Sequence, residues 1–218
     1  LERAVGDLLL QIDERQAAET MANLFGTEHY EVVLHANDMD RVMPDLVWHL
    51  EDLRVGQSYP NYYVARLAGK FVKVVLSGAG GDELFGGYPW RYYRGLDAAD
   101  REDYLNRYYG FWQRLVPDAD KGRLFTTASQ RQIGQHSTFE VFRSIFAGFS
   151  GPLAGREDFV NGSLYFELKT FLHGLLVVED KLSMAHSLET RVPFLDDDLV
   201  EFAVRLPPSH KLRNLDVF

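Results

Sequence analysis

Cysteine is absent from the 218 residues of this chain. Its absence excludes disulfide bonds, zinc sites built on thiolates and a cysteine nucleophile. It is also typical of proteins that fold in the reducing cytosol, so a cytoplasmic location is expected. No run of apolar residues reaches membrane-spanning length and no signal-peptide pattern opens the chain, so no membrane association is expected.

Positive charge is scarce as well, because 23 Lys and Arg residues face 32 Asp and Glu residues, for a formal net charge of −9. This balance argues against broad binding to nucleic acid or to an anionic membrane. A phosphorylated ligand would have to bind through local devices, namely backbone amides, a few basic side chains or a metal ion. The 46% hydrophobic content is that of an ordinary globular protein with a sizeable core.

Helices dominate the expected secondary structure. Two apolar segments rich in β-branched residues, 29–35 and 71–77, predict buried strands that pair in parallel. Apolar residues recur at helical spacing in segments 1–12, 14–26, 38–53, 60–70, 100–116, 137–149, 164–189 and 197–206. Gly26 is expected to end the second of these helices and Asp38 to begin the third. The pattern predicts an α/β part over residues 1–88 and a helical part over residues 89–218.

Directly behind the second predicted strand lies a glycine-rich stretch, residues 76–88, with the sequence LSGAGGDELFGGY. A Walker A loop is excluded because its lysine is missing, and the fingerprint G-x-G-x-x-G fails because Glu83 stands at its third glycine. One interpretation is a tight turn whose glycines only avoid steric strain. The other is a nucleotide sugar or phosphate held by backbone amides and Ser77, with Asp82 available to a divalent cation.

Three stretches carry a resemblance to a known family. They are residues 13–32 (DERQAAETMANLFGTEHYEV), 74–92 (VVLSGAGGDELFGGYPWRY) and 180–212 (DKLSMAHSLETRVPFLDDDLVEFAVRLPPSHKL). In this order they resemble the asparagine synthase family, whose signature is a strand followed by S-G-[acid]-G-[SG]-D-E and a glycine-glycine-aromatic turn. The resemblance covers nearly the whole chain, so residues 1–218 are interpreted as one synthetase domain.

The resemblance implies a fold of the ATP-pyrophosphatase type, a doubly wound parallel sheet with a largely helical C-terminal extension. In this family a carboxylate attacks the α-phosphate of ATP, giving an acyl-adenylate and pyrophosphate, and ammonia then displaces AMP to form an amide. The commonest members act on aspartate and take ammonia from glutamine, which a preceding glutaminase domain hydrolyses. The implied ligands are ATP, Mg²⁺ and a small carboxylate, and a homodimer is one assembly open to the protein.

Site residues follow from the resemblance position by position. The implied nucleotide-binding residues are Ser77, Gly78, Ala79, Gly80 and Gly81. Asp82 would hold Mg²⁺, and Glu83 would either act in catalysis or pair within the helical turn that follows. Lys181, the second catalytic candidate, could approach a phosphate or the substrate carboxylate. For Glu189 and Arg191, a catalytic role and a structural ion pair both stand.

Three departures from the family pattern bear on activity. Ala79 stands where asparagine-forming members carry a carboxylate, which points to a different acceptor or to a branch that dispenses with the acid. The pyrophosphate loop S-G-G-x-D-S is missing at the junction of Ile12 and Asp13. We expect that a segment of the protein is left out of the sequence at this point, rather than that the protein itself has lost it by deletion. The sequence stops before the family's lysine-bearing segment and includes no glutaminase domain, so ammonia is expected from a domain outside it.

Two functional hypotheses result. The first is the synthetase portion of an ATP-dependent, AMP-forming ligase that amidates aspartate or another carboxylated metabolite. The second is a nucleotide-binding pseudoenzyme with the same fold and no catalysis.

Overall fold

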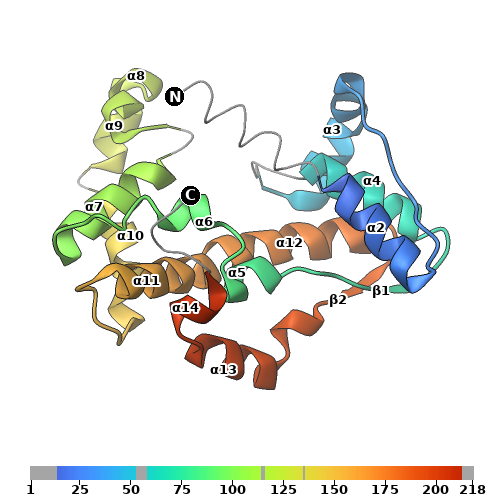
Figure 1. Ribbon diagram of the computed structural model, residues 1–218. Coiled ribbons are helices and arrows are strands. Elements are labelled where there is room, and N and C mark those ends of the chain that lie inside the picture. The colour runs from blue at the N-terminus through green and yellow to red at the C-terminus, as the bar shows by residue number, and fades with distance from the viewer. Residues whose placement is uncertain (1–13, 53–57, 114–115, 135, 213–218) are drawn as a thin grey trace. The chain divides into compact units, whose positions relative to one another are not determined.

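The computed structural model describes residues 14–52, 58–113, 116–134 and 136–212 (Figure 1). The chain divides into two compact units, residues 1–43 and 44–218, and the boundary falls at Pro44 inside helix α3 (Ala36–Leu50). The described part of the first unit holds α2 (Arg15–Phe25) and the beginning of α3. The first predicted helix and the junction of Ile12 and Asp13 lie outside the described residues.

The second unit continues α3 and is mostly helical. Its further elements are α4 (Ser58–Ala68), β1 (Val74–Leu76), α5 (Gly81–Phe85), α6 (Pro89–Tyr92), α7 (Arg101–Trp112), η1 (Asp118–Asp120), α8 (Lys121–Leu124), α9 (Thr127–Ile133), α10 (Thr138–Ile145), η2 (Phe146–Gly148), α11 (Arg156–Lys169), α12 (Phe171–Met184), β2 (Glu189–Arg191), η3 (Pro193–Leu195), α13 (Asp197–Arg205) and α14 (Pro208–Lys211).

The sheet of the described residues consists of β1 and β2, which run parallel with Val74 opposite Glu189 and Leu76 opposite Arg191. The two strands lie side by side near the end of α12, which contacts β2 (Figure 1). A parallel sheet in a mostly helical α/β fold is therefore confirmed. Two strands do not establish the doubly wound arrangement that was expected.

The prediction of a strand at residues 29–35 is wrong, because no strand is present there and the backbone is irregular up to α3. Its valines are not buried as a parallel strand requires, and Val33 is 73% exposed. A strand also needs a neighbour to satisfy its backbone N–H and C=O groups, and the described residues supply none for this segment. β-branched composition alone therefore overstated the sheet.

Helix ends follow the local chemistry. Gly26 ends α2 in the left-handed region at φ 62°, as predicted. α3 begins two residues before Asp38, and the Asp38 carboxylate accepts a hydrogen bond from His35 N at 2.7 Å. The long apolar segment 164–189 breaks at Thr170 into α11 and α12, because Thr170 leaves the helical conformation with φ −127°.

Aromatic side chains form the core of the helical part, between α7, α10 and α11. The buried members of this cluster are Tyr104, Leu105, Tyr108, Phe142, Phe146, Leu153, Phe159 and Phe166. A second cluster joins Leu212, just after α14, to buried residues of α11 and of the segment containing α6. Among the described residues, each helix is too short or too polar to cross a membrane.

Candidate functional site

The carboxyl ends of β1 and β2 meet at one edge of the sheet, and the glycine turn, defined here as residues 77–88, starts there. The amide of Ser77 donates to the Arg191 carbonyl at 2.8 Å and so extends the ladder by one residue beyond β1. In parallel α/β sheets this edge is where ligands bind. The glycine turn therefore lies where the sequence located a ligand site.

Ser77 and Gly78 open the turn. The Ala79 amide donates to Ser77 Oγ at 3.1 Å, which fixes the backbone over three residues. Gly78 is exposed, and a methyl group added to it would meet no atom within 4 Å. The backbone at Gly78 can consequently be approached from solvent, and packing does not explain why a glycine stands there.

Gly80 and Gly81 differ from Gly78 because the chain itself occupies the space beside them. A methyl group on Gly80 would lie 2.4 Å from Leu195 Cδ2 in η3, and Gly80 has φ +92°. A methyl group on Gly81 would lie 3.6 Å from the Phe194 ring. The close approach at Gly80 is therefore to η3, which lies within the third family-like stretch, residues 180–212.

Asp82 and Glu83 begin α5 with opposite exposure. Asp82 is exposed, and its carboxylate lies directly over Gly87, where an added methyl group would be 2.0 Å from Oδ1. Glu83 is buried and accepts a hydrogen bond from the Tyr88 hydroxyl at 3.0 Å. This contact is the pairing within the turn that the sequence left open for Glu83, and its catalytic role stays a prediction.

Metal ligands are sparse around the turn. The described residues contain no group of three His, Cys, Asp or Glu side chains that could hold a metal ion. Mg²⁺, however, often binds proteins through one or two carboxylates and takes its remaining ligands from water and substrate phosphates. The exposed carboxylate of Asp82 fits that mode and not a cage made of protein ligands alone.

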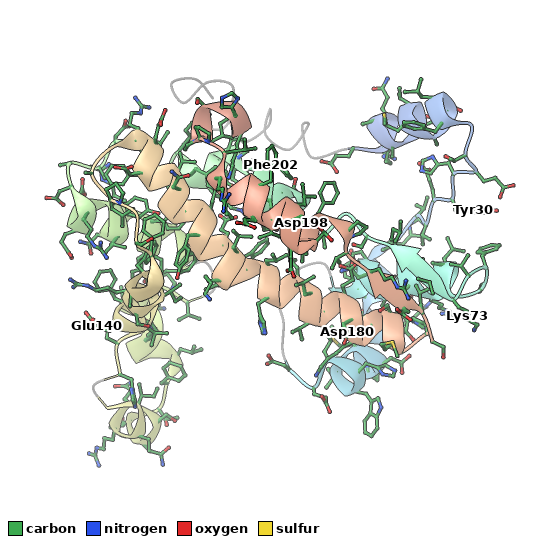
Figure 2. All side chains as sticks on the ribbon, turned by 90° about the horizontal axis from the view of Figure 1, so that it is seen from below. Tyr30, Lys73, Glu140, Asp180, Asp198 and Phe202 are labelled. Carbon is green, nitrogen blue, oxygen red and sulfur yellow. The ribbon has the colours of Figure 1, made fainter. Side chains whose placement is uncertain are left out.

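Lys181 lies in α12 and contacts the last residue of α3 and the residue that follows it. Its ammonium group donates to the Leu50 carbonyl at 2.9 Å and to Glu51 Oε2 at 2.7 Å. It thus satisfies a carbonyl at the C-terminus of α3, where a cation is favoured. An open groove of about 840 Å³ runs along this contact, and its wall includes Trp48 of α3 and Asp180 of α12. Figure 2 labels Asp180. No contact joins Lys181 to the glycine turn among the described interactions.

Glu189 and Arg191 lie on β2, where residues two apart share one face of the strand. Arg191 Nε donates to Glu189 Oε1 at 2.9 Å, and both side chains are more than half exposed. The ion-pair interpretation thus describes their geometry.

A buried charge cluster, which we define as Glu83, Tyr88, Arg91, Tyr108 and Glu167, joins the glycine turn to the helical part. Sequence reasoning missed Arg91 and Glu167. Arg91 Nη1 pairs with Glu167 Oε2 at 3.1 Å, and the Tyr108 hydroxyl donates to Glu167 Oε1 at 3.0 Å. A sequence signal for Glu167 exists: it lies inside the aromatic segment LYFELKTF, where side chains are expected to be buried, and a buried glutamate needs a partner.

Burial raises the pKa of three groups of this cluster, Glu167, Tyr88 and Tyr108. It raises the pKa of Glu167 to about 7, against the attraction of Arg91 and the hydrogen bond from Tyr108, which act to lower it. Burial, together with the negative charges of Glu83 and Asp82, raises the pKa of the Tyr88 hydroxyl, so it remains a hydrogen-bond donor at neutral pH.

A mostly helical α/β domain with a glycine turn at the carboxyl ends of parallel strands is the class that fold and site define. The family model described as asparagine synthase matches residues 9–216. This chain therefore belongs to the asparagine synthase family.

Curated relatives agree with this assignment. The chain is 34% identical over 224 residues to a putative glutamine-hydrolysing asparagine synthetase of Mycobacterium tuberculosis, covering 91% of this chain and 34% of the relative. It is 32% identical over 221 residues to glutamine-hydrolysing asparagine synthetase 1 of Bacillus subtilis, with 91% and 35% covered. The amidase chyE of Penicillium rubens is 27% identical over 246 residues, with 93% and 36% covered. The chain spans about a third of the length of these relatives.

Proposed function

We propose that this chain is the synthetase portion of an ATP-dependent, amide-forming ligase. An oxygen of the substrate carboxylate bonds to the α-phosphorus of ATP, and the bond from that phosphorus to the bridging oxygen breaks, releasing pyrophosphate. The nitrogen of ammonia then bonds to the acyl carbon, AMP leaves, and the nitrogen loses a proton. Family membership supports this reaction, and the relatives named glutamine-hydrolysing support glutamine as the source of ammonia.

The observation that carries the proposal is the open backbone at Gly78, beyond the carboxyl ends of two parallel strands. We assign the nucleotide to the turn formed by Ser77, Gly78, Ala79, Gly80 and Gly81, in a sheet of the doubly wound type. Here Gly78 leaves room for a phosphate or ribose, while Gly80 and Gly81 hold the turn against η3. Asp82 would bind Mg²⁺, which supplies charge neutralisation for the leaving pyrophosphate.

The acceptor acid is where this chain departs from asparagine-forming members. Ala79 has no group to orient a substrate ammonium, so we propose that the acid is aspartate or, with more support from this position, another carboxylated metabolite. The likeness to an amidase, chyE, shows that named relatives of this chain include proteins not called asparagine synthetases. Glu83 and Lys181 are the proposed catalytic side chains.

The test is carboxylate-dependent exchange of labelled pyrophosphate into ATP, measured over a panel of carboxylic acids. We expect Gly78→Ala to raise the KM for ATP at least about tenfold, because a methyl group at the point of approach costs one or more contacts. Gly110→Ala is the matched control, since Gly110 also has no atom within 4 Å of an added methyl group but lies in α7. Its KM should equal that of the parent protein.

The alternatives give different results. Saturable ATP binding without exchange for any acid would favour the nucleotide-binding pseudoenzyme. An unchanged KM in Gly78→Ala would remove the nucleotide from this turn.

A further inference from the structure

Two short helices belong to this region, α5 within the glycine turn and α6 directly after it, and neither is long enough to be stable alone. α5 has five residues and α6 has four, well below the length at which an isolated helix forms in water. Contacts with α11 are made by both helices. The conformation of the turn therefore depends on interactions with residues far along the chain.

The buried charge cluster supplies such an interaction through continuous contacts. The Tyr88 hydroxyl donates to Glu83 at 3.0 Å, and the guanidinium carbon of Arg91 lies 3.8 Å from the centre of the Tyr88 ring. The same guanidinium pairs with Glu167 at 3.1 Å. Glu167 is thereby linked to Glu83, 84 positions earlier, by one arginine and one tyrosine.

The guanidinium group of Arg91 has little freedom in this arrangement. The Arg91 side chain is 7% exposed and that of Glu167 is fully buried. The Phe171 ring lies 4.1 Å from the guanidinium carbon, in addition to the Tyr88 ring. The two rings are perpendicular to each other, so the cation fills the corner between them, and its pair with Glu167 restrains it there.

We infer that Arg91 is a positioning residue for the glycine turn: paired with Glu167, it fixes the ring of Tyr88, and Tyr88 fixes the carboxylate of Glu83 at the start of α5. Its effect on ATP rests on the proposed function, whereas its effect on the turn does not. The ion pair of Arg91 thus acts on the turn through Tyr88.

Tyr88→Phe tests the inference, because it keeps the ring that Arg91 contacts and removes only the hydroxyl bonded to Glu83. Tyr104→Phe is the matched control, since its buried hydroxyl is hydrogen-bonded to Ser163 at 2.9 Å inside the aromatic core. Both variants lose one side-chain hydrogen bond of a tyrosine, part-buried at Tyr88 and buried at Tyr104. Only Tyr88→Phe loses it within the turn.

Hydrogen exchange of the intact protein without nucleotide is the first measurement. The amides to follow are those of Leu84, Gly86 and Gly87, which donate to Gly80 or to Asp82 within the turn. We expect the protection of these amides in Tyr88→Phe to fall about tenfold or more, because the variant loses a hydrogen bond to a carboxylate. Tyr104→Phe should leave these amides within about twofold of the parent once global stability is matched with denaturant.

Pyrophosphate exchange is the second measurement. We expect Tyr88→Phe to raise the KM for ATP about tenfold, because a displaced turn weakens binding, and to lower kcat as well, because Glu83 is a proposed catalytic side chain. Arg91→Lys should give an intermediate KM, since lysine can pair with Glu167 but cannot stack as a plane.

The inference is overturned if Tyr88→Phe leaves the turn amides as protected as in the parent, or if Tyr104→Phe exposes them equally. A parent protein that neither binds ATP nor exchanges pyrophosphate would refute the proposed function alone, since amide protection still decides the inference.

Discussion

Glu167 is a buried carboxyl group whose ionisation opposes folding, and Glu167→Gln isolates that effect. The carboxyl group faces Arg91 on α6, Tyr108 on α7 and the charge of Glu83 on α5. Glutamine keeps the shape of the side chain, its oxygen can accept from Arg91 and its NH2 group can donate to the Tyr108 hydroxyl, but it does not titrate.

The magnitude follows from the change in pKa. Burial raises the pKa of Glu167 from 4.5 to about 7, so between these values the folded protein binds a proton that the unfolded chain has released. The contribution of Glu167 to the free energy of unfolding is therefore largest below pH 4.5 and falls as the pH rises toward 7. The fall amounts to about 3 kcal/mol.

Urea unfolding of the parent and of Glu167→Gln at several pH values between 4.5 and 8 measures this contribution. The difference in unfolding free energy, parent minus variant, removes the titration of all groups that the two proteins share. We expect this difference to fall by about 3 kcal/mol from pH 4.5 to 8. A constant difference, or one that rises with pH, would refute the assignment of a raised pKa to a buried Glu167.

Three further predictions concern stability and the proposed site. Gly80→Ala should lower the free energy of unfolding by about 3 kcal/mol, because of the positive φ at this position and the clash with η3. Gly78→Ala should leave it within about 0.5 kcal/mol of the parent. Equal losses of stability, measured by thermal unfolding, would contradict the packing argument. Lys181→Met should lower the free energy of unfolding by about 1 kcal/mol and the rate of pyrophosphate exchange at least about a hundredfold. Glu51→Gln breaks the same ion pair and should preserve exchange. Equal losses of exchange in the two variants would show that Lys181 has only a structural role. Ser187→Gly should raise the free energy of unfolding by about 0.5–1 kcal/mol, and with it the midpoint of thermal unfolding, because Ser187 has φ 55°. A lower midpoint would show that this conformation carries no strain.

Local structure could be predicted from the sequence where neighbouring residues determine it. Gly26 ends α2 in the left-handed region, and Asp100 begins α7 with its carboxylate bonded to the Asp103 amide. β1 lies within the predicted segment 71–77. The two helix ends depend on contacts within a few positions, and the residue types that make them are few, whereas β1 is predicted from its β-branched composition.

The pairing partners could not be predicted in the same way. The sequence predicts no strand at β2 and assigns Glu189 to the helical segment 164–189, yet the backbone of β2 pairs with β1 115 positions earlier. Arg91 and Glu167 are 76 positions apart, and no spacing rule connects them. A charged residue in an apolar segment predicts that a partner exists, but which residue it is depends on how α6 and α11 pack.

The glycine turn shows why composition alone does not locate a ligand. Gly80 is required because Leu195 occupies the space beside it, and Gly87 is required because the Asp82 carboxylate lies over it. Both would be glycine whether or not a nucleotide binds. Gly78 has neither a neighbour nor a positive φ, so nothing within the described chain requires the absence of a side chain there. A ligand that approaches the backbone gives a reason for glycine at this position, which is why Gly78 and not the glycine count is the discriminating site for mutation.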